Sequence, residues 1–317
     1  MDDPALAQAM KRLTAWMDGR CRQAGIIQHS FESPPFGTAY VCISPGDDSP
    51  YPSSNNNRVH LCGAEGGLTG EGVARLAKLF GEAGVSRYFI WLTPGPNMEA
   101  VRDWLLGAGL GRFPFVSYPT LARGVDEPSL VDTGLEVREL AVEEAAHLAG
   151  PPAEAAWPEY LRTTGLPGFC HFMAFDGNRP VASAVLCTFE ELGYLCMART
   201  AEADRGRGAQ RALIAKRIDK ARALGCRTFV SETLSIVPIS LGNLRKAGFE
   251  TVYEKRSTRP SWRVECLRTR RRSDIPWIQP LNSPGALPLQ AQRGGLLLWG
   301  RPRQQLTSTH FTYIYKL

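Results

Sequence analysis

A ten-residue segment in the second half of the chain, RGRGAQRALI (205–214), sets the strongest limit on the fold. It follows the strand-like run YLCMART and opens an amphipathic run that ends near Gly225. Glycines at 206 and 208 allow a sharp turn and a close backbone approach to a ligand. The first turn of the following helix leaves N–H groups unpaired, and these favour a phosphate or pyrophosphate. Three arginines add fork-shaped donors for phosphate oxygens: Arg205, Arg207 and Arg211.

The residues around this segment predict an α+β domain built on a mostly antiparallel sheet. LEVREL alternates as a strand does, and a helix is expected from Val142. Three further strands, FMAF, VASAVLCTF and YLCMART, are separated by the turn sequences DGNRP and EELG. A helix over 208–224 places Ile214, Ile218 and Ala221 on one face. CRTFVSE, SLGNLRK and FETVYEK then predict a strand, a short helix and a last strand.

The first half of the chain repeats part of this order. We expect helices over 5–24, 73–83 and 98–106, a strand over 88–92, an exposed loop over 44–57 and a linker over 121–134. Residues 82–110 and 223–249 both run through a glycine, a strand, a loop, a helix and a second glycine. This similarity suggests two copies of one fold. The predicted domains are therefore residues 1–130, residues 131–258 and a tail of residues 259–317.

Charge and cysteine usage narrow the class of protein. The net charge is +6 over 317 residues, but the tail from Arg259 holds ten Lys or Arg against two acidic residues. The basic balance thus belongs to the tail, which is also rich in proline and is expected to be poorly ordered. The eight cysteines form no CxxC pair or spacing typical of zinc sites, and no apolar run is long enough to cross a membrane. We therefore expect a reduced, cytoplasmic protein without a metal or a membrane partner.

The segment Arg205–Gln210 resembles the pyrophosphate loop of the GCN5-related N-acetyltransferase (GNAT) superfamily, (R/Q)-x-x-G-x-(G/A). The resemblance covers about residues 135–256, and Gln210 stands where the family usually has Gly or Ala. It implies two GNAT-like domains, each a mixed, mostly antiparallel sheet flanked by helices, with acetyl-CoA as the acyl donor. The residues that it assigns to the donor are Met197, Ala198, Arg199, Thr200, Arg205, Gly206, Arg207, Gly208, Ala209 and Gln210.

A second motif of the family, N-x-x-A-x-x-L-Y-x-x-x-G-F, is only partly present. Counted back from Gly248 and Phe249, Val237 takes the Asn position and Leu244 the Tyr position. In the family this tyrosine often protonates the departing thiolate, so the resemblance leaves the proton donor unassigned. Glu232, at the end of CRTFVSE, is the candidate base for the amine; alternatively it caps Ser or Thr groups.

The resemblance also assigns roles to two aromatic residues and to one loop of the first half. Trp157 and Tyr160 lie in the region that forms the acceptor pocket in the family, although both are equally suited to a hydrophobic core. At the equivalent of the glycine loop, the first half reads AEGGLTGEG (64–72). Its two acidic residues would repel a pyrophosphate, and it has no arginine to bind one. We therefore interpret the first half as a degenerate copy.

The leading prediction is an N-acetyltransferase in which an amine of a small molecule or peptide attacks the thioester of acetyl-CoA directly. A non-catalytic acyl-CoA-binding module is the alternative, because the family's tyrosine is missing. Nucleic-acid binding through RTRRR in the tail is a third hypothesis, and the scarcity of interleaved aromatic residues argues against it.

Overall fold

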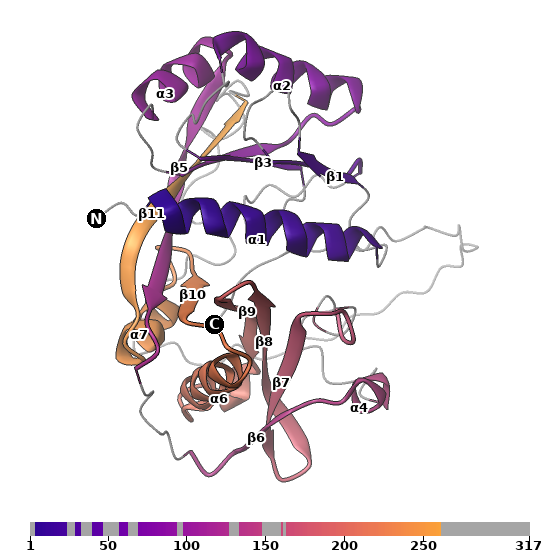
Figure 1. The fold of residues 1–317 in the computed structure, drawn as a ribbon, viewed down its shortest axis with the longest axis vertical. Helices are drawn as coiled ribbons and strands as arrows, with labels where there is room; N and C mark the ends of the chain where they lie inside the picture. Colours follow the sequence, from indigo (N-terminus) through magenta and orange to yellow (C-terminus); the bar gives the residue numbers. More distant parts are fainter. Residues whose placement is uncertain are drawn as a thin grey trace, which may run out of the picture. The chain divides into compact units, whose positions relative to one another are not determined.

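The described residues of this computed structural model form one mixed sheet of eleven strands (Figure 1). The structure describes residues 4–23, 29–32, 40–46, 57–62, 69–93, 98–126, 133–147, 160 and 163–260. All of them belong to one compact unit. Of the predicted tail, only Arg259 and Pro260 fall within this range, and both belong to the last strand. The expectations for the rest of the tail, including RTRRR, lie outside the described residues.

Helices and strands alternate in a similar order in the two halves. The first half contains α1 (Pro4–Gln23), β1 (His29–Glu32), β2 (Tyr40–Ile43), β3 (Arg58–Cys62), α2 (Gly70–Glu82), β4 (Phe89–Thr93), α3 (Met98–Gly107) and β5 (Leu110–Arg123). The second half contains β6 (Glu136–Glu139), α4 (Val142–His147), β7 (Phe169–Asp176), β8 (Arg179–Phe189), β9 (Leu192–Thr200), α6 (Ala209–Ala223), β10 (Thr228–Glu232), α7 (Pro238–Lys246) and β11 (Glu250–Pro260).

The two halves exchange their last strands. Across the sheet the order is β1-β2-β3-β4-β11-β5-β10-β9-β8-β7-β6. β3 pairs with β4 in parallel in the first half, as β9 pairs with β10 in the second. β11 lies between β4 and β5, and β5 lies between β11 and β10, each antiparallel to its neighbours. Neither half therefore completes its part of the sheet alone.

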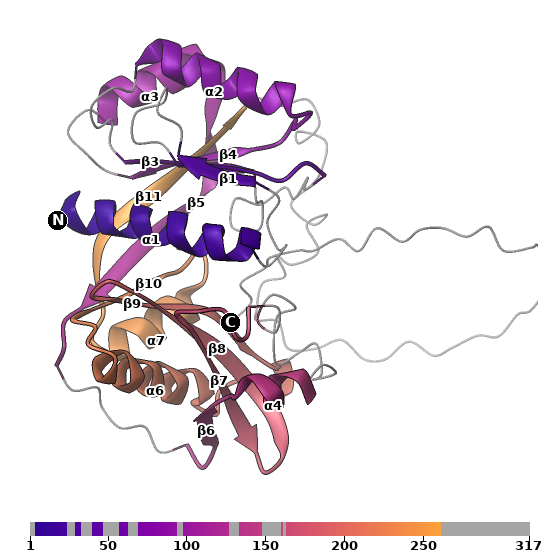
Figure 2. The ribbon, with the colours of Figure 1, turned by 45° about the vertical axis from the view of Figure 1, so that its right-hand side comes forward.

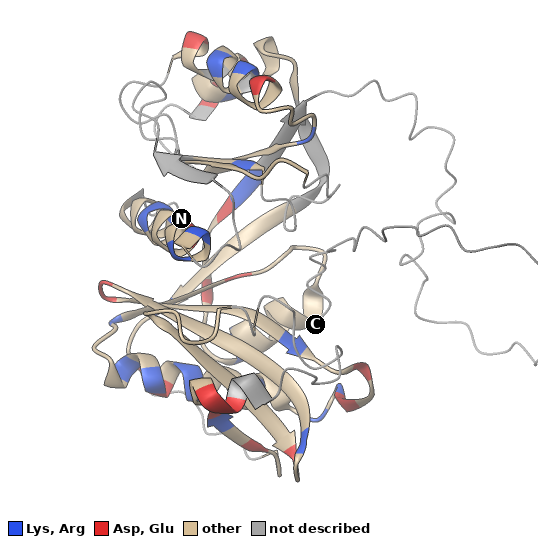
Figure 3. Cartoon of the chain, turned by 90° about the vertical axis from the view of Figure 1, so that its right-hand side faces the viewer, with Lys and Arg blue, Asp and Glu red and all other residues tan. Residues whose placement is uncertain are grey.

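Helices cover both faces of the strands in the second half. Helix α6 packs on one face of β8 and β9, and α1 packs on the opposite face of β9 and β10 (Figure 2). The alternation of the strands sends Leu195 and Phe229 to the α6 side, and Tyr194 and Val230 to the α1 side. In this half, most of the charged residues lie on helices and turns, and the strands carry few of them (Figure 3).

The strand exchange also joins the two hydrophobic cores. The first half has a core between α2, α3 and the strands β2 to β4, in which Phe80 and Tyr88 stack with ring centroids 4.1 Å apart. Leu121 of β5, by contrast, is fully buried in the core of the second half together with residues of α6. A strand that belongs to the first half in sequence thus contributes to packing in the second.

The structure confirms the predicted helices and the predicted strands of the second half, with small shifts at their ends. The short strands β1 to β3 and the long strand β5 were not predicted. The predicted linker over 121–134 is wrong at its start, because β5 extends through Arg123. The predicted exposed loop over 44–57 is wrong at its end: Asn57 is fully buried, and its side chain bonds to the backbone N–H and C=O of Ser44. Residues 47–56 of that loop lie outside the described residues.

The exchange predicts that the two halves unfold together. Leu121→Ala removes a buried β5 side chain from the second core and should lower the free energy of unfolding by about 2–5 kcal/mol. Leu105→Ala, in the core of the first half, is the matched variant. Both should shift one cooperative denaturation transition, and hydrogen exchange should show lost protection in β4 and β9 alike. Two separate transitions, one for each half, would contradict this coupling.

Candidate functional site

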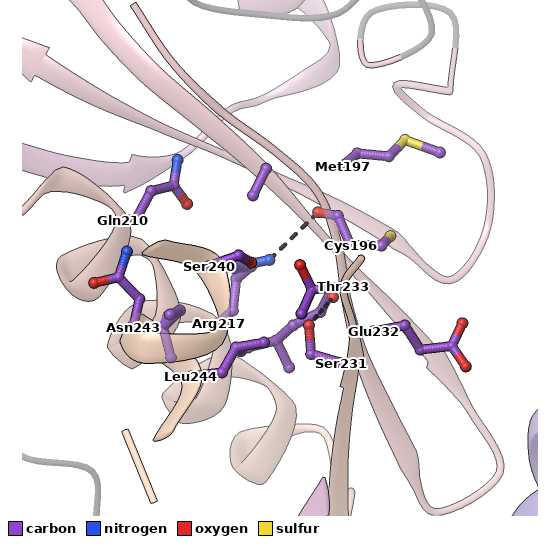
Figure 4. Close-up of a pocket in the computed structure, with 13 residues that line it drawn as sticks. Cys196, Met197, Gln210, Arg217, Ser231, Glu232, Thr233, Ser240, Asn243 and Leu244 are labelled. Atoms are coloured by element: carbon purple, nitrogen blue, oxygen red, sulfur yellow. Dashed lines mark hydrogen bonds between the residues drawn. The ribbon is translucent and has the colours of Figure 1, made fainter. Parts of the chain in front are cut away.

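A pocket opens where two parallel strands of the sheet separate. β9 and β10 pair only as far as Leu195 and Ser231, whose hydroxyl donates to the carbonyl of Leu195 at 2.9 Å. Beyond this point β10 stays with β5, with Glu232 opposite Thr120, while β9 stays with β8. The pocket lies in this gap, and α6 and α7 supply its other walls (Figure 4).

A β-bulge in β9 shapes one wall of the pocket. Met197 has a φ of 50°, in the left-handed region, and the pairing of β8 with β9 shifts register at this place. Cys196 and Met197 consequently both pack on the α1 side, whereas Leu195 and Ala198 both pack on the α6 side. A bulge leaves main-chain groups outside the ladder, where a ligand in the gap can reach them. Of the residues predicted to contact the donor's arm, Met197 and Ala198 line the pocket.

The glycine loop starts α6 without a side-chain cap. Gly206 and Gly208 have φ angles of 82° and 83°, which side chains rarely adopt. Gly208 is the N-cap residue, and a Cβ on it would lie 2.8 Å from Cγ2 of Thr133. Because glycine has no side-chain acceptor, the cap residue does not bind the first-turn N–H groups of residues 209–211, and an external partner can do so. This helix end has the geometry and the partial positive charge that an anion requires.

Two carboxylates hold one of the loop arginines. Arg207 Nη1 pairs with Asp176 Oδ2 at 2.8 Å and with Asp204 Oδ1 at 2.9 Å. Arg179 reaches the same two carboxylates, and its hydrogen bonds to the buried Asp204 hold the pKa of that carboxyl below its usual value. Among the residues that the structure describes, Arg205 makes one long ion pair, of 3.8 Å, within its own turn. Arg207 therefore braces the loop, and Arg205 is the better placed of the two to meet a phosphate.

Gln210, the residue that departs from the family pattern, ties the loop to β9. Its side-chain amide donates to the carbonyl of Arg199 and to the hydroxyl of Thr200, both at 2.9 Å. A glycine or an alanine could not make these bonds. Arg199 and Thr200 pair with Ser183 and Ala182 of β8 and lie beyond the pocket lining. The loop and the strand before it are thus held together by a side chain.

Glu232 lies at the split, with its carboxylate turned away from the α7 side of the pocket (Figure 4). Its Oε1 accepts from the hydroxyl of Thr120 at 2.7 Å and from Lys255 Nζ at 2.6 Å. Its Oε2 accepts one long bond of 3.3 Å from the hydroxyl of Tyr194. The ion pair is buried, with side-chain exposures of 6% for Glu232 and 9% for Lys255. Oε2 is therefore the oxygen with a lone pair available for a proton.

Aromatic rings of the first half lie beside this ion pair. The Lys255 ammonium is 5.7 Å from the ring centroid of Trp91 and 5.4 Å from that of Tyr118. Trp91 belongs to β4, Tyr118 to β5 and Lys255 to β11, which lies between those two strands. The strand exchange therefore brings residues of both halves to the neighbourhood of Glu232.

Of the two predicted acceptor residues, the structure describes only Tyr160; Trp157 lies outside the described residues. Tyr160 is fully buried, donates its hydroxyl to the carbonyl of Phe172 at 2.9 Å and meets His171 edge-on. Burial raises the pKa of its phenol well above the usual value. Since Tyr160 is not part of the pocket lining, the alternative interpretation as a core aromatic residue is favoured.

Two charged residues of the site were not predicted from the sequence. Arg217 lines the pocket from α6, and Lys255 pairs with Glu232 from β11. Arg217 lies three residues after Ile214 and four before Ala221, so it falls on the face predicted to be apolar. A charged residue on that face is a signal that could have identified it. Lys255 has no such signal, because its partner strands belong to the other half.

The described ranges contain neither a metal-binding cluster nor a membrane-spanning helix. No group of three or more His, Cys, Asp or Glu side chains in those ranges could hold a metal ion. None of the helices that the structure describes is long and apolar enough to cross a membrane. The sulfurs of two free cysteines, Cys187 and Cys196, lie 3.6 Å apart beneath the bulge.

A comparison with solved structures finds proteins named as GNAT proteins or acetyltransferases. A GCN5-related N-acetyltransferase from Kribbella flavida has a TM-score of 0.55 and 13% identity, covering 80% of this chain and 96% of that one. A tandem GNAT protein from the clavulanic acid biosynthesis pathway (12% identity, 70% and 81% covered) has a TM-score of 0.49. A GNAT-family acetyltransferase from Novosphingobium aromaticivorans (16% identity, 75% and 91% covered) has a TM-score of 0.46. The first of these likenesses establishes the fold.

A family match covers the part of the chain that forms the pocket. No curated protein matches the sequence. Residues 135–249, however, match the sequence model of the Acetyltransferase (GNAT) family. The match includes the strands β6 to β10, the glycine loop, α6 and α7. Residues 135–249 are therefore a GNAT acetyltransferase domain, and the protein is an acyltransferase.

Proposed function

We propose that this protein transfers the acetyl group of acetyl-CoA to an amine of a small molecule or peptide. The observation that carries the proposal is that one helix, α6, serves both places: Gly208 caps its start without a side-chain bond, and its residues Gln210, Ile214 and Arg217 line the pocket. The pocket itself lies where β9 and β10 separate. The helix end suits a pyrophosphate, and the gap between the strands suits a thioester. Turnover of acetyl-CoA with a panel of amines tests the proposal, and binding without turnover would favour the non-catalytic module.

The donor-binding residues proposed here have different tasks. Arg205 and the N–H groups of residues 209–211 would bind the pyrophosphate, and Gly206 and Gly208 allow the loop to approach it. Arg207 and Gln210 would hold the loop in shape through the contacts described above. The main chain of residues 197–200 would contact the pantetheine arm, with the bulge nearest to the thioester.

The proposed reaction is a direct attack of the neutral amine on the thioester carbonyl carbon. The carbon–nitrogen bond forms, and the carbon–sulfur bond breaks with its electron pair on sulfur. A main-chain N–H at the Met197 bulge would polarise the carbonyl oxygen. Glu232 would take the amine proton at Oε2, directly or through a water. Thr120 and Lys255 occupy Oε1 and so fix the orientation of the carboxylate.

We further propose that the first half is a degenerate copy of the fold, with the domain boundary near residue 130. The order from α2 to β5 parallels that from α6 to β11. Helix α2, the counterpart of α6, is already capped: the hydroxyl of Thr69 accepts from the N–H of Gly72 at 3.2 Å, and Glu71 adds a negative charge. Such a helix start has little to offer an anion. We also propose a cytoplasmic location, because the cysteines in the described residues are free and disulfides are rare in the cytosol.

The first turn of α6 predicts the effect of a charge reversal. Arg211→Glu places a carboxylate beside the proposed pyrophosphate without altering a glycine. We expect the affinity for acetyl-CoA to fall by roughly 10–100-fold, measured by isothermal titration calorimetry. An acidic residue in the first turn stabilises a helix, so unfolding would not explain the loss. Lys216→Glu, exposed in the middle of the same helix, is the control and should bind as the wild type does. Equal affinities for the wild type and Arg211→Glu would remove this helix end from the site.

The buried ion pair determines how the role of Glu232 is tested. Glu232→Gln alone leaves the Lys255 ammonium buried and unpaired, which should destabilise the fold by about 3–5 kcal/mol whatever its catalytic role. Glu232→Gln/Lys255→Met removes both charges and should recover most of that stability. If Glu232 takes the proton, the double variant should still react roughly 10²–10⁴-fold more slowly, with unchanged affinity for acetyl-CoA. Thermal melts and single-turnover rates measure the two effects, and a double variant with nearly wild-type rate would leave Glu232 a structural role only.

The capped start of α2 predicts a single donor site. The full-length chain should bind about one acetyl-CoA, because α6 combines an uncapped start with neighbouring arginines and α2 does not. Calorimetry or native mass spectrometry gives the stoichiometry. A value near two would show that the first half has kept a site, and the interpretation as a degenerate copy would be wrong.

A further inference from the structure

Arg217 is a buried cation on the wall of the pocket. It is 2% exposed and lies on α6. Its Nε donates to the carbonyl of Leu213 at 3.0 Å, and its Nη1 donates to the carbonyls of Val185 and Cys196 at 3.1 and 3.3 Å. No carboxylate in the described part of the chain forms an ion pair with it. The neutral carbonyls bind the guanidinium but do not balance its charge.

A charge held in this way is costly for the fold. Burying an ion without a counter-ion costs several kcal/mol, even where hydrogen bonds are made. Burial lowers the pKa of Arg217 to about 10, so the guanidinium still carries its charge at neutral pH. An apolar residue would simply continue the face formed by Ile214, Ile218 and Ala221. A function for the positive charge within the pocket would account for an arginine at this position.

The position of Arg217 relative to the start of α6 indicates which part of bound acetyl-CoA it would contact. It lies eight residues after Ala209, about 12 Å along the helix axis from the end that would bind the pyrophosphate. Its guanidinium binds the carbonyl of Cys196, directly before the Met197 bulge (Figure 4). It therefore lies on the α6 side of the split, where the sulfur would enter. Glu232 and the approaching amine belong to the α1 side.

We propose that Arg217 stabilises the thiolate of CoA as it leaves, an inference that rests on the proposed function. The electron pair of the broken carbon–sulfur bond stays on sulfur, and a cation close to the resulting anion has a strong effect where bulk water is excluded. Arg217 Nη2 makes no hydrogen bond to any described residue and can donate to this sulfur. Leu244, which lines the same pocket, has no proton to give. The anion is thus stabilised by charge and takes a proton from water after its release.

The ionisation of bound CoA tests the proposal without any acceptor. The full-length protein is titrated with CoA and with desulfo-CoA, which lacks the thiol, from about pH 6.5 to 9.5 by calorimetry. A nearby cation lowers the pKa of the thiol, so the affinity for CoA relative to desulfo-CoA should rise with pH. The rise should be about tenfold for each unit by which the thiol pKa is lowered. In Arg217→Gln the ratio should stay constant, while desulfo-CoA still binds.

The ratio of the two affinities, for CoA and for desulfo-CoA, separates the ionisation of the CoA thiol from that of the protein's own groups. The groups that face Arg217 are the thiols of Cys187 and Cys196 and the phenol of Tyr160, with the Glu232 carboxylate across the split. Where their ionisation acts on the parts that the two ligands share, it cancels in the ratio. Any direct effect of these groups on the thiol remains in Arg217→Gln, which keeps all of them, so the comparison of the two proteins isolates the arginine. Arg217→Lys keeps a positive charge and should keep part of the rise. Lys216→Gln, exposed on the same helix, should behave as the wild type does.

Three results would overturn one proposal or the other. A constant ratio in the wild-type protein would overturn the role of Arg217. Equal losses of CoA and desulfo-CoA binding in both Arg217 variants would do the same, because they would assign the residue to the fold alone. If the wild type does not bind desulfo-CoA, the proposed function itself fails. Unfolding midpoints are measured for each variant, and Arg217→Lys decides the question if Arg217→Gln does not fold.

Discussion

The pairing of β5 with β10 is the interaction on which the pocket depends. A strand in the middle of a sheet can leave one neighbour only if its other neighbour holds it. β10 separates from β9 after Ser231, yet Glu232 stays in register with Thr120 of β5, and the N–H of Thr233 still donates to the carbonyl of Pro119 at 3.3 Å. The first half of the chain therefore supplies the strand that keeps the split open.

The charges around the split are divided between the two faces of the sheet. On the α6 side, Arg217 is held by backbone carbonyls next to the bulge. On the α1 side, Glu232 is held by Lys255, which in turn lies near two aromatic rings. A buried anion and a buried cation thus lie on opposite sides of the place where a thioester would pass. This polarity suits a reaction in which a proton leaves on one side and a negative charge develops on the other.

Sequence reasoning succeeded where the signal was local and failed where it was not. The glycine loop, α6 and the three antiparallel strands were predictable because turn residues and periodicity lie within a short window. The position of Glu232 at a strand end was also predictable, but its partner Thr120 lies 112 residues earlier in the chain. The sequence predicts a linker where β5 ends, because Gly124 and the residues after it resemble a loop. The strands that pair with β5 lie far away in the sequence, so no nearby segment indicates a strand there.

The exchanged strands also have a consequence for how the acceptor specificity of such a protein could evolve. Trp91, Tyr118 and Thr120 belong to the half without the glycine loop, yet they lie around the Glu232–Lys255 pair. Substitutions at these positions alter the side from which an amine would approach, while the helix end that would hold the nucleotide stays as it is. Mutations in the first half could therefore change which acceptor is used without changing the proposed donor site. If the first half is the degenerate copy proposed above, it would still act on the reaction, through the substrate side of its neighbour's site.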